Sequence, residues 1–180
     1  SLTAGYGVEP EQAFSYLIQQ RLDSIGLPYR VINAGLSGET TASGVNRIDW
    51  VLREPVAIMI LELGGNDGLR GIDPAETKKN LQQIIGIAQN KYSNIQIIIA
   101  GMEAPPNMGS EYITAFRDVF KSLAADNNLR LIPFLLEGVG GEPELNLPDG
   151  IHPNPEGHKI VADNVWQVLE EFLPENAASD

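Results

Sequence analysis

Two nearly continuous apolar runs limit most strongly what this chain can fold into. Residues 56–63 read Val-Ala-Ile-Met-Ile-Leu-Glu-Leu, and residues 95–100 read Ile-Gln-Ile-Ile-Ile-Ala. Short runs of this kind are typical of strands that are covered on both faces, as in a parallel sheet. Neighbouring parallel strands need long crossover connections, which are usually helices. We therefore expect helices between the runs.

The segments around the two runs carry helical patterns. In residues 11–25 apolar side chains recur at spacings of three and four, and Gly26 follows as a stop. Thr40 or Thr41 is a suitable cap for the second helix, and Asp73 and Asn154 each precede a proline at the start of a later one. The predicted helices cover residues 11–25, 40–52, 73–92, 110–127 and 154 onward. Two further short strands are predicted at 29–33 and 130–133, with a loop at 64–72.

This alternation of helix and strand predicts an α/β fold, a three-layer αβα sandwich around a central parallel sheet of flavodoxin-like order. The chain opens on a helix, one strand short at the front. Because the first strand of that order lies inside the sheet, we expect about 5 to 15 residues upstream of Ser1 to form an apolar strand. A length of 180 residues with 43% apolar residues predicts a single domain over residues 1–174, with 175–180 as a frayed tail.

Composition excludes several classes of function. The net charge is -12, and the 12 Lys and Arg residues are scattered, which argues against a nucleic acid or an anionic membrane surface as partner. Cysteine is absent, so thiolate catalysis and disulfides are excluded. No run of 18 apolar residues occurs, and we expect no stable membrane insertion. A small neutral or zwitterionic substrate fits this composition better, and no partner protein is indicated.

Residues suited to acyl transfer occur in four clusters, each placed after a predicted strand or at the start of the chain. Ser1 opens a glycine-bearing turn, and Gly38 and Asn66 mark the second and third clusters. In the fourth, Asp149 and His152 are three residues apart, close enough for the carboxylate to hold Nδ1–H while Nε2 faces the serine. The imidazole would then be general base to Ser1 and later general acid to the leaving group.

Each cluster alone also fits an ordinary turn or a helix-capping approach. Their order and their common position at the carboxyl ends of strands, where ligands bind in doubly wound sheets, favour catalysis. His158, in the last helix, is expected on the surface or in a capping role. Asp67 either orients the loop beside Asn66 or is a solvated turn carboxylate. No His-rich set of ligands accompanies the acidic residues, so no metal site is indicated.

The four clusters, in this order, resemble the four blocks of the SGNH hydrolases, the GDSL-type esterases. The stretch 62–71, Glu-Leu-Gly-Gly-Asn-Asp-Gly-Leu-Arg-Gly, is similar to the bacterial branch of thioesterase I, lysophospholipase L1 and arylesterase. The Gly-Asp that precedes the serine in the family is not in this sequence. The resemblance implies a Ser-His-Asp triad without a cofactor. It also implies an oxyanion hole made by the N–H of Ser1, the N–H of Gly38 and the side-chain amide of Asn66.

The resemblance further implies hydrolysis of acyl or aryl esters, with acyl thioesters and lysophospholipids as further candidates. Residues 68–71 resemble the mobile loop of that branch, whose movement accompanies acyl binding. Relatives often carry export signals, which suggests a periplasmic or secreted enzyme, with the cytoplasm as the alternative. The residues expected to contact the substrate are Leu69, Arg70, Met102, Pro105 and Ile151.

Three alternatives stay open. A carbohydrate O-deacetylase of the same fold is one, since Tyr6, Glu39 and Asn107 are suited to a polar acyl acceptor. An N-terminal nucleophile hydrolase would use the α-amine of Ser1 as base, but that class has layered antiparallel sheets, which this alternation of elements does not predict. A non-catalytic lipid- or glycan-binding domain is the third.

Overall fold

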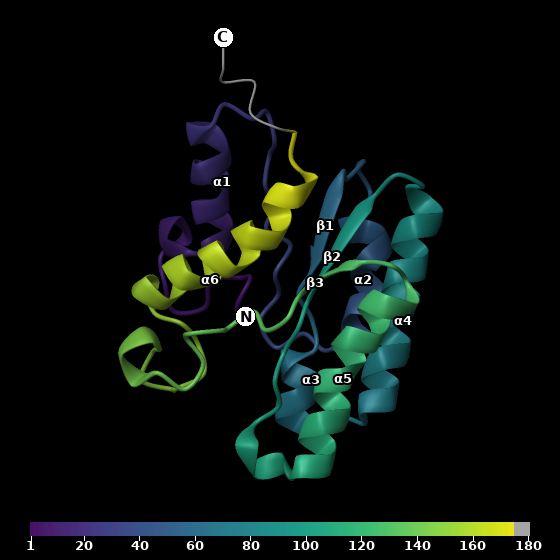
Figure 1. The fold of residues 1–180 in the computed structure, drawn as a ribbon, viewed down its shortest axis with the longest axis vertical. Helices are drawn as coiled ribbons and strands as arrows, with labels where there is room; N and C mark the ends of the chain where they lie inside the picture. Colours follow the sequence, from purple (N-terminus) through teal and green to yellow (C-terminus); the bar gives the residue numbers. More distant parts are fainter. Residues whose placement is uncertain (175–180) are drawn as a thin grey trace. The chain divides into compact units, whose positions relative to one another are not determined.

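The computed structural model describes residues 1–174 and divides the chain into two compact units. The central unit is Gly38–Leu135, and the terminal unit joins Ser1–Ser37 to the described residues from Leu136 onward. Figure 1 labels their helices and strands. The single domain expected over residues 1–174 stays a prediction, and the tail expected at 175–180 lies outside the described residues.

A parallel three-stranded sheet organises the central unit. Its strands are β1 (Ile58–Leu61), β2 (Gln96–Ala100) and β3 (Arg130–Ile132), in the order β1-β2-β3. Ile58 pairs with Gln96, and Ile98 with Arg130. These strands fall within the three segments predicted from residues 56–63, 95–100 and 130–133. The expected α/β class with a parallel sheet is therefore confirmed.

Helices flank this sheet, and two of them begin at the caps that the sequence predicts. Thr40 accepts a hydrogen bond from the N–H of Ser43, and Asp73 accepts one from Ala75. Helix α4 (Pro74–Lys91) contacts both α2 (Thr41–Val51) and α5 (Ser110–Asp126), as Figure 1 shows, and α5 also contacts β2 and β3. The helices of the central unit are α2 (Thr41–Val51), α3 (Gly65–Arg70), α4 (Pro74–Lys91), α5 (Ser110–Asp126) and the 3-10 helix η2 (Pro106–Met108).

The core of the central unit lies between the sheet and these helices. Phe116 and Phe120 of α5 are buried and meet edge to face, with ring centroids 5.4 Å apart. Such a pair adds about 0.5 to 1.5 kcal/mol to the free energy gained by burial alone. The other fully buried large side chains of this unit are Leu52, Leu81, Ile84, Ile85, Ile98, Ile99, Leu123, Ile132 and Leu135.

The terminal unit is built on two helices that pack together, α1 (Phe14–Ser24) and α6 (Pro155–Leu169). Its short 3-10 helices are η1 (Pro10–Gln12), η3 (Pro143–Leu145) and η4 (Glu170–Phe172). The inner faces are the apolar stripes expected from the helical spacing. The buried apolar residues of the two helices are Phe14, Ile18, Leu22, Val161, Ala162, Val165 and Leu169.

Each unit contains one of the two tryptophans of the chain, and each indole lies beside a guanidinium group. Trp166 of α6 has the Arg21 guanidinium carbon 5.0 Å from its ring centroid. Trp50 of α2 has Arg53 at the same distance, and the Trp50 side chain is 62% exposed. Cation–π contacts at such exposed sites contribute about 0.5 to 1 kcal/mol.

The strand predicted at residues 29–33 is not formed. Among the described residues no segment pairs with it in a ladder, and its backbone bonds instead to a side chain of α1. Gln19 donates from Nε2 to the carbonyl of Tyr29, and its Oε1 accepts the N–H of Val31. A strand needs a neighbouring backbone, whereas the apolar pattern reports only the tendency of the side chains.

The loop predicted at residues 64–72 contains a short helix, α3, which the sequence did not indicate. Its residues include Gly65 and Gly68, which have low helix propensity. The helix forms because neighbouring segments hold it. The ring of Phe116 lies so close to Gly68 that a Cβ there would come within 3.0 Å of it, and the hydroxyl of Tyr112 donates to the carbonyl of Ile72 just beyond the helix.

His158 lies in the interior of the terminal unit, so the expected surface position is wrong, and its contacts support the other expectation, a capping role. It is 1% exposed, and its Nδ1 accepts the N–H of Phe14 at 3.1 Å. The residue before α1 is Ala13, which offers no side-chain cap. His158 therefore supplies, from another helix, the acceptor that the first turn of α1 lacks.

Replacement of His158 tests this role. We expect His158→Ala to lower the free energy of unfolding by about 1 to 3 kcal/mol, because the N–H of Phe14 becomes buried and unpaired. His158→Asn keeps an acceptor close to the position of Nδ1 and should cost less. Urea unfolding at pH 7 measures both variants, and equal losses in the two would contradict a capping role.

A comparison of the wild type with His158→Asn also tests how His158 makes stability depend on pH. Burial, followed by the charge of His152, lowers the pKa of His158 from 6.5 to about 4. Between these values the unfolded chain binds more protons than the folded chain, so His158 causes stability to fall as the pH drops from 6.5 towards 4. The difference in unfolding free energy between the wild type and His158→Asn should narrow over this interval. A difference that is constant with pH would show that His158 does not titrate there.

Candidate active site

Ser1, His152 and Asp149 form a line of hydrogen bonds within the terminal unit. The Oγ of Ser1 lies 2.8 Å from Nε2 of His152, and Nδ1 of His152 lies 2.7 Å from Oδ2 of Asp149. A neutral imidazole that donates its Nδ1–H to the carboxylate has an acceptor at Nε2. This acceptor faces the serine hydroxyl, which is the arrangement that general-base activation of a nucleophile requires.

Asp149 is held by the turn that it opens. Its Oδ1 accepts the backbone N–H groups of Ile151 and His152, at 2.9 and 3.0 Å. Hydrogen bonds lower the pKa of Asp149 to about 2. The largest effect comes from the backbone N–H of His152, followed by the side chain of His152 and the backbone N–H of Ile151. The carboxylate is therefore ionised at neutral pH, when its charge can orient and stabilise the imidazole.

The turn between these two residues is closed tightly just before α6. The N–H of Leu147 donates to the carbonyl of His152 at 2.7 Å, and Gly150, at a φ of 67°, lies in the left-handed region that glycine tolerates best. Asn154 then caps α6 by accepting the N–H groups of Glu156 and Gly157. His152 is thus fixed from both sides, by the turn and by the start of a helix.

Tyr6 packs on the predicted base, a contact that the sequence did not indicate. Its ring centroid lies 4.5 Å from that of His152, with the two planes inclined at 41°. Tyr6 belongs to the turn that Ser1 opens, and its N–H donates to the carbonyl of Ser1. No periodic pattern marks this residue. The turn therefore places both the hydroxyl and an aromatic side chain beside the imidazole.

In the central unit, Gly38 and Asn66 lie on two turns that hydrogen bonds connect. The side-chain amide of Asn66 donates one N–H to the carbonyl of Glu39 at 3.1 Å, so its second N–H is available to another acceptor. Gly38 has a φ of 78°, which favours glycine, and Arg70 donates to its carbonyl. Both residues carry N–H donors of the kind expected of an oxyanion hole.

Glu39, between these turns, is paired with a cation. Glu39 is 8% exposed, and its carboxylate accepts two hydrogen bonds from the guanidinium group of Arg47, at 2.8 and 2.7 Å. This bond to Glu39 is the first cause of the raised pKa of Arg47. A bidentate pair of this kind fixes the side chain of Glu39. Its backbone carbonyl therefore has a defined position for Asn66.

The residues expected to contact the substrate differ in exposure. Leu69 and Ile151 are 48% and 44% exposed, and Arg70 is exposed as well. Met102, by contrast, is 7% exposed, and its Cε lies close to Gly65 beside Asn66. As the structure stands, Met102 supports the turn more than it offers a surface to an acyl chain. Pro105 is half-buried.

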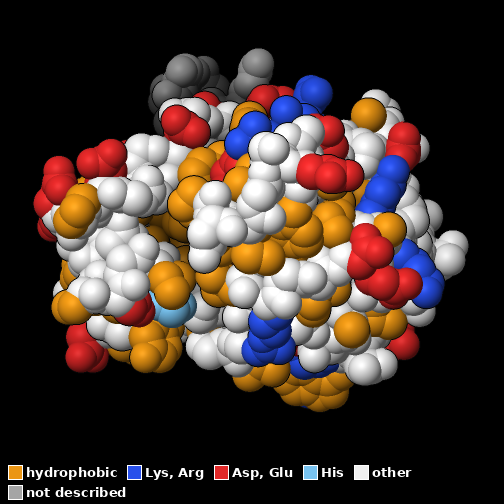
Figure 2. Space-filling model, turned by 90° about the horizontal axis from the view of Figure 1, so that it is seen from below, with side chains coloured by type: hydrophobic (Ala, Val, Ile, Leu, Met, Phe, Trp, Pro, Cys, Tyr) orange, Lys and Arg blue, Asp and Glu red, His pale blue; other side chains and the backbone are white. Residues whose placement is uncertain are grey.

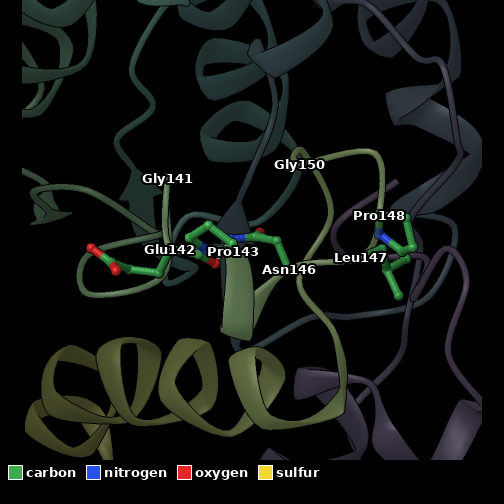
Figure 3. Close-up of a pocket in the computed structure, with 7 residues that line it drawn as sticks. All are labelled: Gly141, Glu142, Pro143, Asn146, Leu147, Pro148 and Gly150. Carbon is green, nitrogen blue, oxygen red and sulfur yellow. Dashed lines mark hydrogen bonds between the residues drawn. The ribbon is translucent and has the colours of Figure 1, made fainter.

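A pocket of about 300 Å³ adjoins the Asp149–His152 turn in the terminal unit, as Figure 3 shows. The amide of Asn146 in its wall donates to the carbonyls of Val139 and Glu142, while its buried Oδ1 has no hydrogen-bond partner among residues 1–174. The lining residues are Gly141, Glu142, Pro143, Asn146, Leu147, Pro148 and Gly150. Ser1 and His152 are not among them, so this pocket is not the space in front of the serine hydroxyl.

Charged side chains are distributed over the surface. On the face drawn in Figure 2, Lys and Arg side chains stand in separate small groups among acidic and hydrophobic ones. In the part of the chain that the structure describes, no group of three or more His, Cys, Asp or Glu residues is arranged to hold a metal ion. None of the helices within residues 1–174 is long and apolar enough to cross a membrane.

Comparisons with known proteins agree on one family. Residues 1–160 match the family described as GDSL-like Lipase/Acylhydrolase. The chain is 40% identical to "Esterase TesA" of Pseudomonas aeruginosa over 96% of its own length and 86% of that protein. It is 35% identical to "Thioesterase 1/protease 1/lysophospholipase L1" of Escherichia coli K12, over 96% and 81% of the two chains. A crystal structure of TesA, 40% identical, covers 96% of each chain with a TM-score of 0.91.

The carboxylate of Asp149 provides a direct test of the geometry in the turn. In the wild type its side-chain carboxyl carbon should titrate by NMR with a midpoint near pH 2. His152→Ala removes the hydrogen bond from the imidazole but keeps the two backbone donors, so the pKa of Asp149 should rise towards the ordinary value of 3.8 without reaching it. A midpoint of 3.8 in the wild type would contradict the observed turn.

Proposed function

The chain belongs to the GDSL-like lipase/acylhydrolase family and is a carboxylic ester hydrolase, and on that premise we propose that Ser1, His152 and Asp149 are its catalytic triad. Membership of this family confirms the resemblance inferred from the four clusters. The observation that supports the triad most strongly is the line of two hydrogen bonds, 2.8 and 2.7 Å long, through His152. Each residue has the partner that its proposed role requires.

In the proposed acylation step, Nε2 of His152 accepts the proton of Ser1 as Oγ attacks the carbonyl carbon of the substrate. The C–O or C–S bond to the leaving group then breaks, and the imidazolium returns the proton to the departing alcohol or thiol. A water molecule repeats the sequence on the acyl-enzyme and releases the acid. Asp149 stays ionised throughout and stabilises the imidazolium.

The negative charge that develops on the carbonyl oxygen needs preorganised donors. We assign these to the N–H of Ser1, the N–H of Gly38 and the free N–H of the Asn66 amide. Support comes from the family resemblance of the motifs and, for Asn66, from its bond to Glu39, which fixes the amide and takes up one of its two N–H donors. One such donor contributes about 10²- to 10³-fold to the rate.

We propose acyl and aryl esters as the substrates, with acyl thioesters and lysophospholipids as further candidates. The relatives are named esterase and thioesterase/lysophospholipase, which supports this range. Exposed apolar side chains at Leu69 and Ile151 suit an acyl chain better than a sugar. Arg70 and Pro105 complete the substrate-binding set of this proposal, whereas Met102, which is 7% exposed, would act by supporting the turn beside Asn66.

Ser1→Ala and His152→Ala should each lower kcat for a p-nitrophenyl ester by about 10⁴-fold or more, because either change removes the activated nucleophile. A fluorophosphonate should add once to the wild type, with the adduct on Ser1 in peptide maps. Ser24→Ala and His158→Asn are matched controls of the same residue types outside the triad. Turnover retained by Ser1→Ala would refute the assignment.

A substrate panel tests the acyl preference. The value of kcat/KM should be higher for aryl esters and for acyl thioesters of increasing chain length than for acetylated oligosaccharides, because the exposed side chains expected at the site are largely apolar. A preference for acetylated oligosaccharides would instead identify a carbohydrate O-deacetylase. Saturable binding of lipid or glycan with no turnover in the wild type would identify a binding domain.

A further inference from the structure

Asp67 is a buried carboxylate that directly follows Asn66 in α3. Its exposed fraction is 0%, so the solvated turn carboxylate considered from the sequence is wrong. Taking a carboxylate out of water costs several kcal/mol unless its oxygens accept good hydrogen bonds. The groups that stabilise Asp67 therefore indicate what the residue does.

The hydrogen-bond partners of Asp67 come mainly from the start of α2. Thr41 donates its backbone N–H to Oδ2 at 2.9 Å and its hydroxyl to Oδ1 at 2.5 Å. The Nδ2 of Asn80 donates to the same hydroxyl oxygen, so the proton of Thr41 is directed at the carboxylate. The hydroxyl of Thr77 lies 3.4 Å from Oδ1. Thr41 and Thr77 are as fully buried as Asp67.

A hydrogen bond made by Asn66 lies next to the bonds between Asp67 and Thr41. Asn66 donates to the carbonyl of Glu39, so residues 66 and 67 bind residues 39 and 41 through neighbouring contacts. Two adjacent bonds fix both the distance and the orientation between the turns, which one bond would not do. These turns carry Gly38 and Asn66, and catalytic donors lose much of their effect when they are displaced by about 1 Å.

We infer that Asp67 is a positioning residue, which holds the Asn66 amide in the arrangement that an oxyanion requires. This inference rests on the proposed function, since it acts through a donor assigned there. Asp67 itself is buried beneath the turns and is not proposed to contact the substrate. Its contribution should appear in kcat, because the oxyanion forms only during the reaction.

A double-mutant cycle with Asn66 tests the inference. Asp67→Asn preserves size but replaces one acceptor oxygen by an NH₂ group, so the N–H and the hydroxyl of Thr41 can no longer both donate to the side chain. We expect kcat to fall about 10- to 100-fold, below the full effect of one oxyanion donor, with KM within about twofold of the wild type. In the Asn66→Ala background the same change should alter kcat by less than about threefold, because the donor it positions is gone.

Substitutions of Thr41, the hydrogen-bond partner of Asp67, test the inference even if Asp67→Asn does not fold. Thr41→Val removes the hydroxyl and keeps the backbone N–H, whereas Thr41→Ser keeps both donors. Thr41→Val should lower kcat as Asp67→Asn does, and Thr41→Ser should restore it to near the wild-type value. Equal kcat in the valine and serine variants would overturn the inference.

Asn127→Ala is a matched control for a lost polar contact in the same unit. Asn127 exchanges two hydrogen bonds of 2.8 Å with Gln82, away from both turns, so the variant should lower Tm and leave kcat unchanged. If Asp67→Asn costs the same factor in kcat with and without Asn66, the residue supports only the fold and the inference fails. If Asn66→Ala alone leaves kcat unchanged, it is the proposed oxyanion hole that fails.

Discussion

Strand β2 has to pair along both of its edges, because residues 97–100 are at most 2% exposed and their backbone groups have no access to water. This requirement produces the parallel sheet, with β1 on one side and β3 on the other. A parallel sheet brings the carboxyl ends of its strands to one edge. The first turn of α3, which carries Asn66, follows β1 after residues 62–64. The oxyanion donors proposed for the central unit therefore depend on the burial of a strand that contributes none of them.

The two units stabilise their important carboxylates in different ways. Asp149 is partly exposed and accepts two backbone N–H groups of its own turn as well as the imidazole, so its charge is held locally. Asp67 is fully buried, and its donors come from Thr41 and Thr77, which belong to other helices. A locally held group can be inferred from spacing in the sequence. A group held by distant segments becomes evident only when the chain is folded.

The same distinction explains how much of the fold and site the sequence predicted. Helix caps, apolar stripes and the Asp149–His152 spacing are local features, and the structure contains them as expected. The strand predicted at 29–33 was wrong, because a strand forms only where a neighbouring strand pairs with it. The loop predicted at 64–72 was wrong because packing against α5 stabilises a short helix there. The interior position of His158 had no local signal either. The acceptor that α1 needs comes from a residue 144 positions away in the chain.

The distribution of the tryptophans gives the molecule a useful optical property. Trp50 lies in the central unit and Trp166 in the terminal unit, and each indole has an arginine against its face. A variant that keeps one indole has an emission spectrum that reports on one unit alone. Fluorescence of two such variants would therefore separate the melting of the terminal unit, which contains Asp149 and His152, from the melting of the sheet in the central unit. The two melting curves would then show whether the two units of this enzyme unfold together.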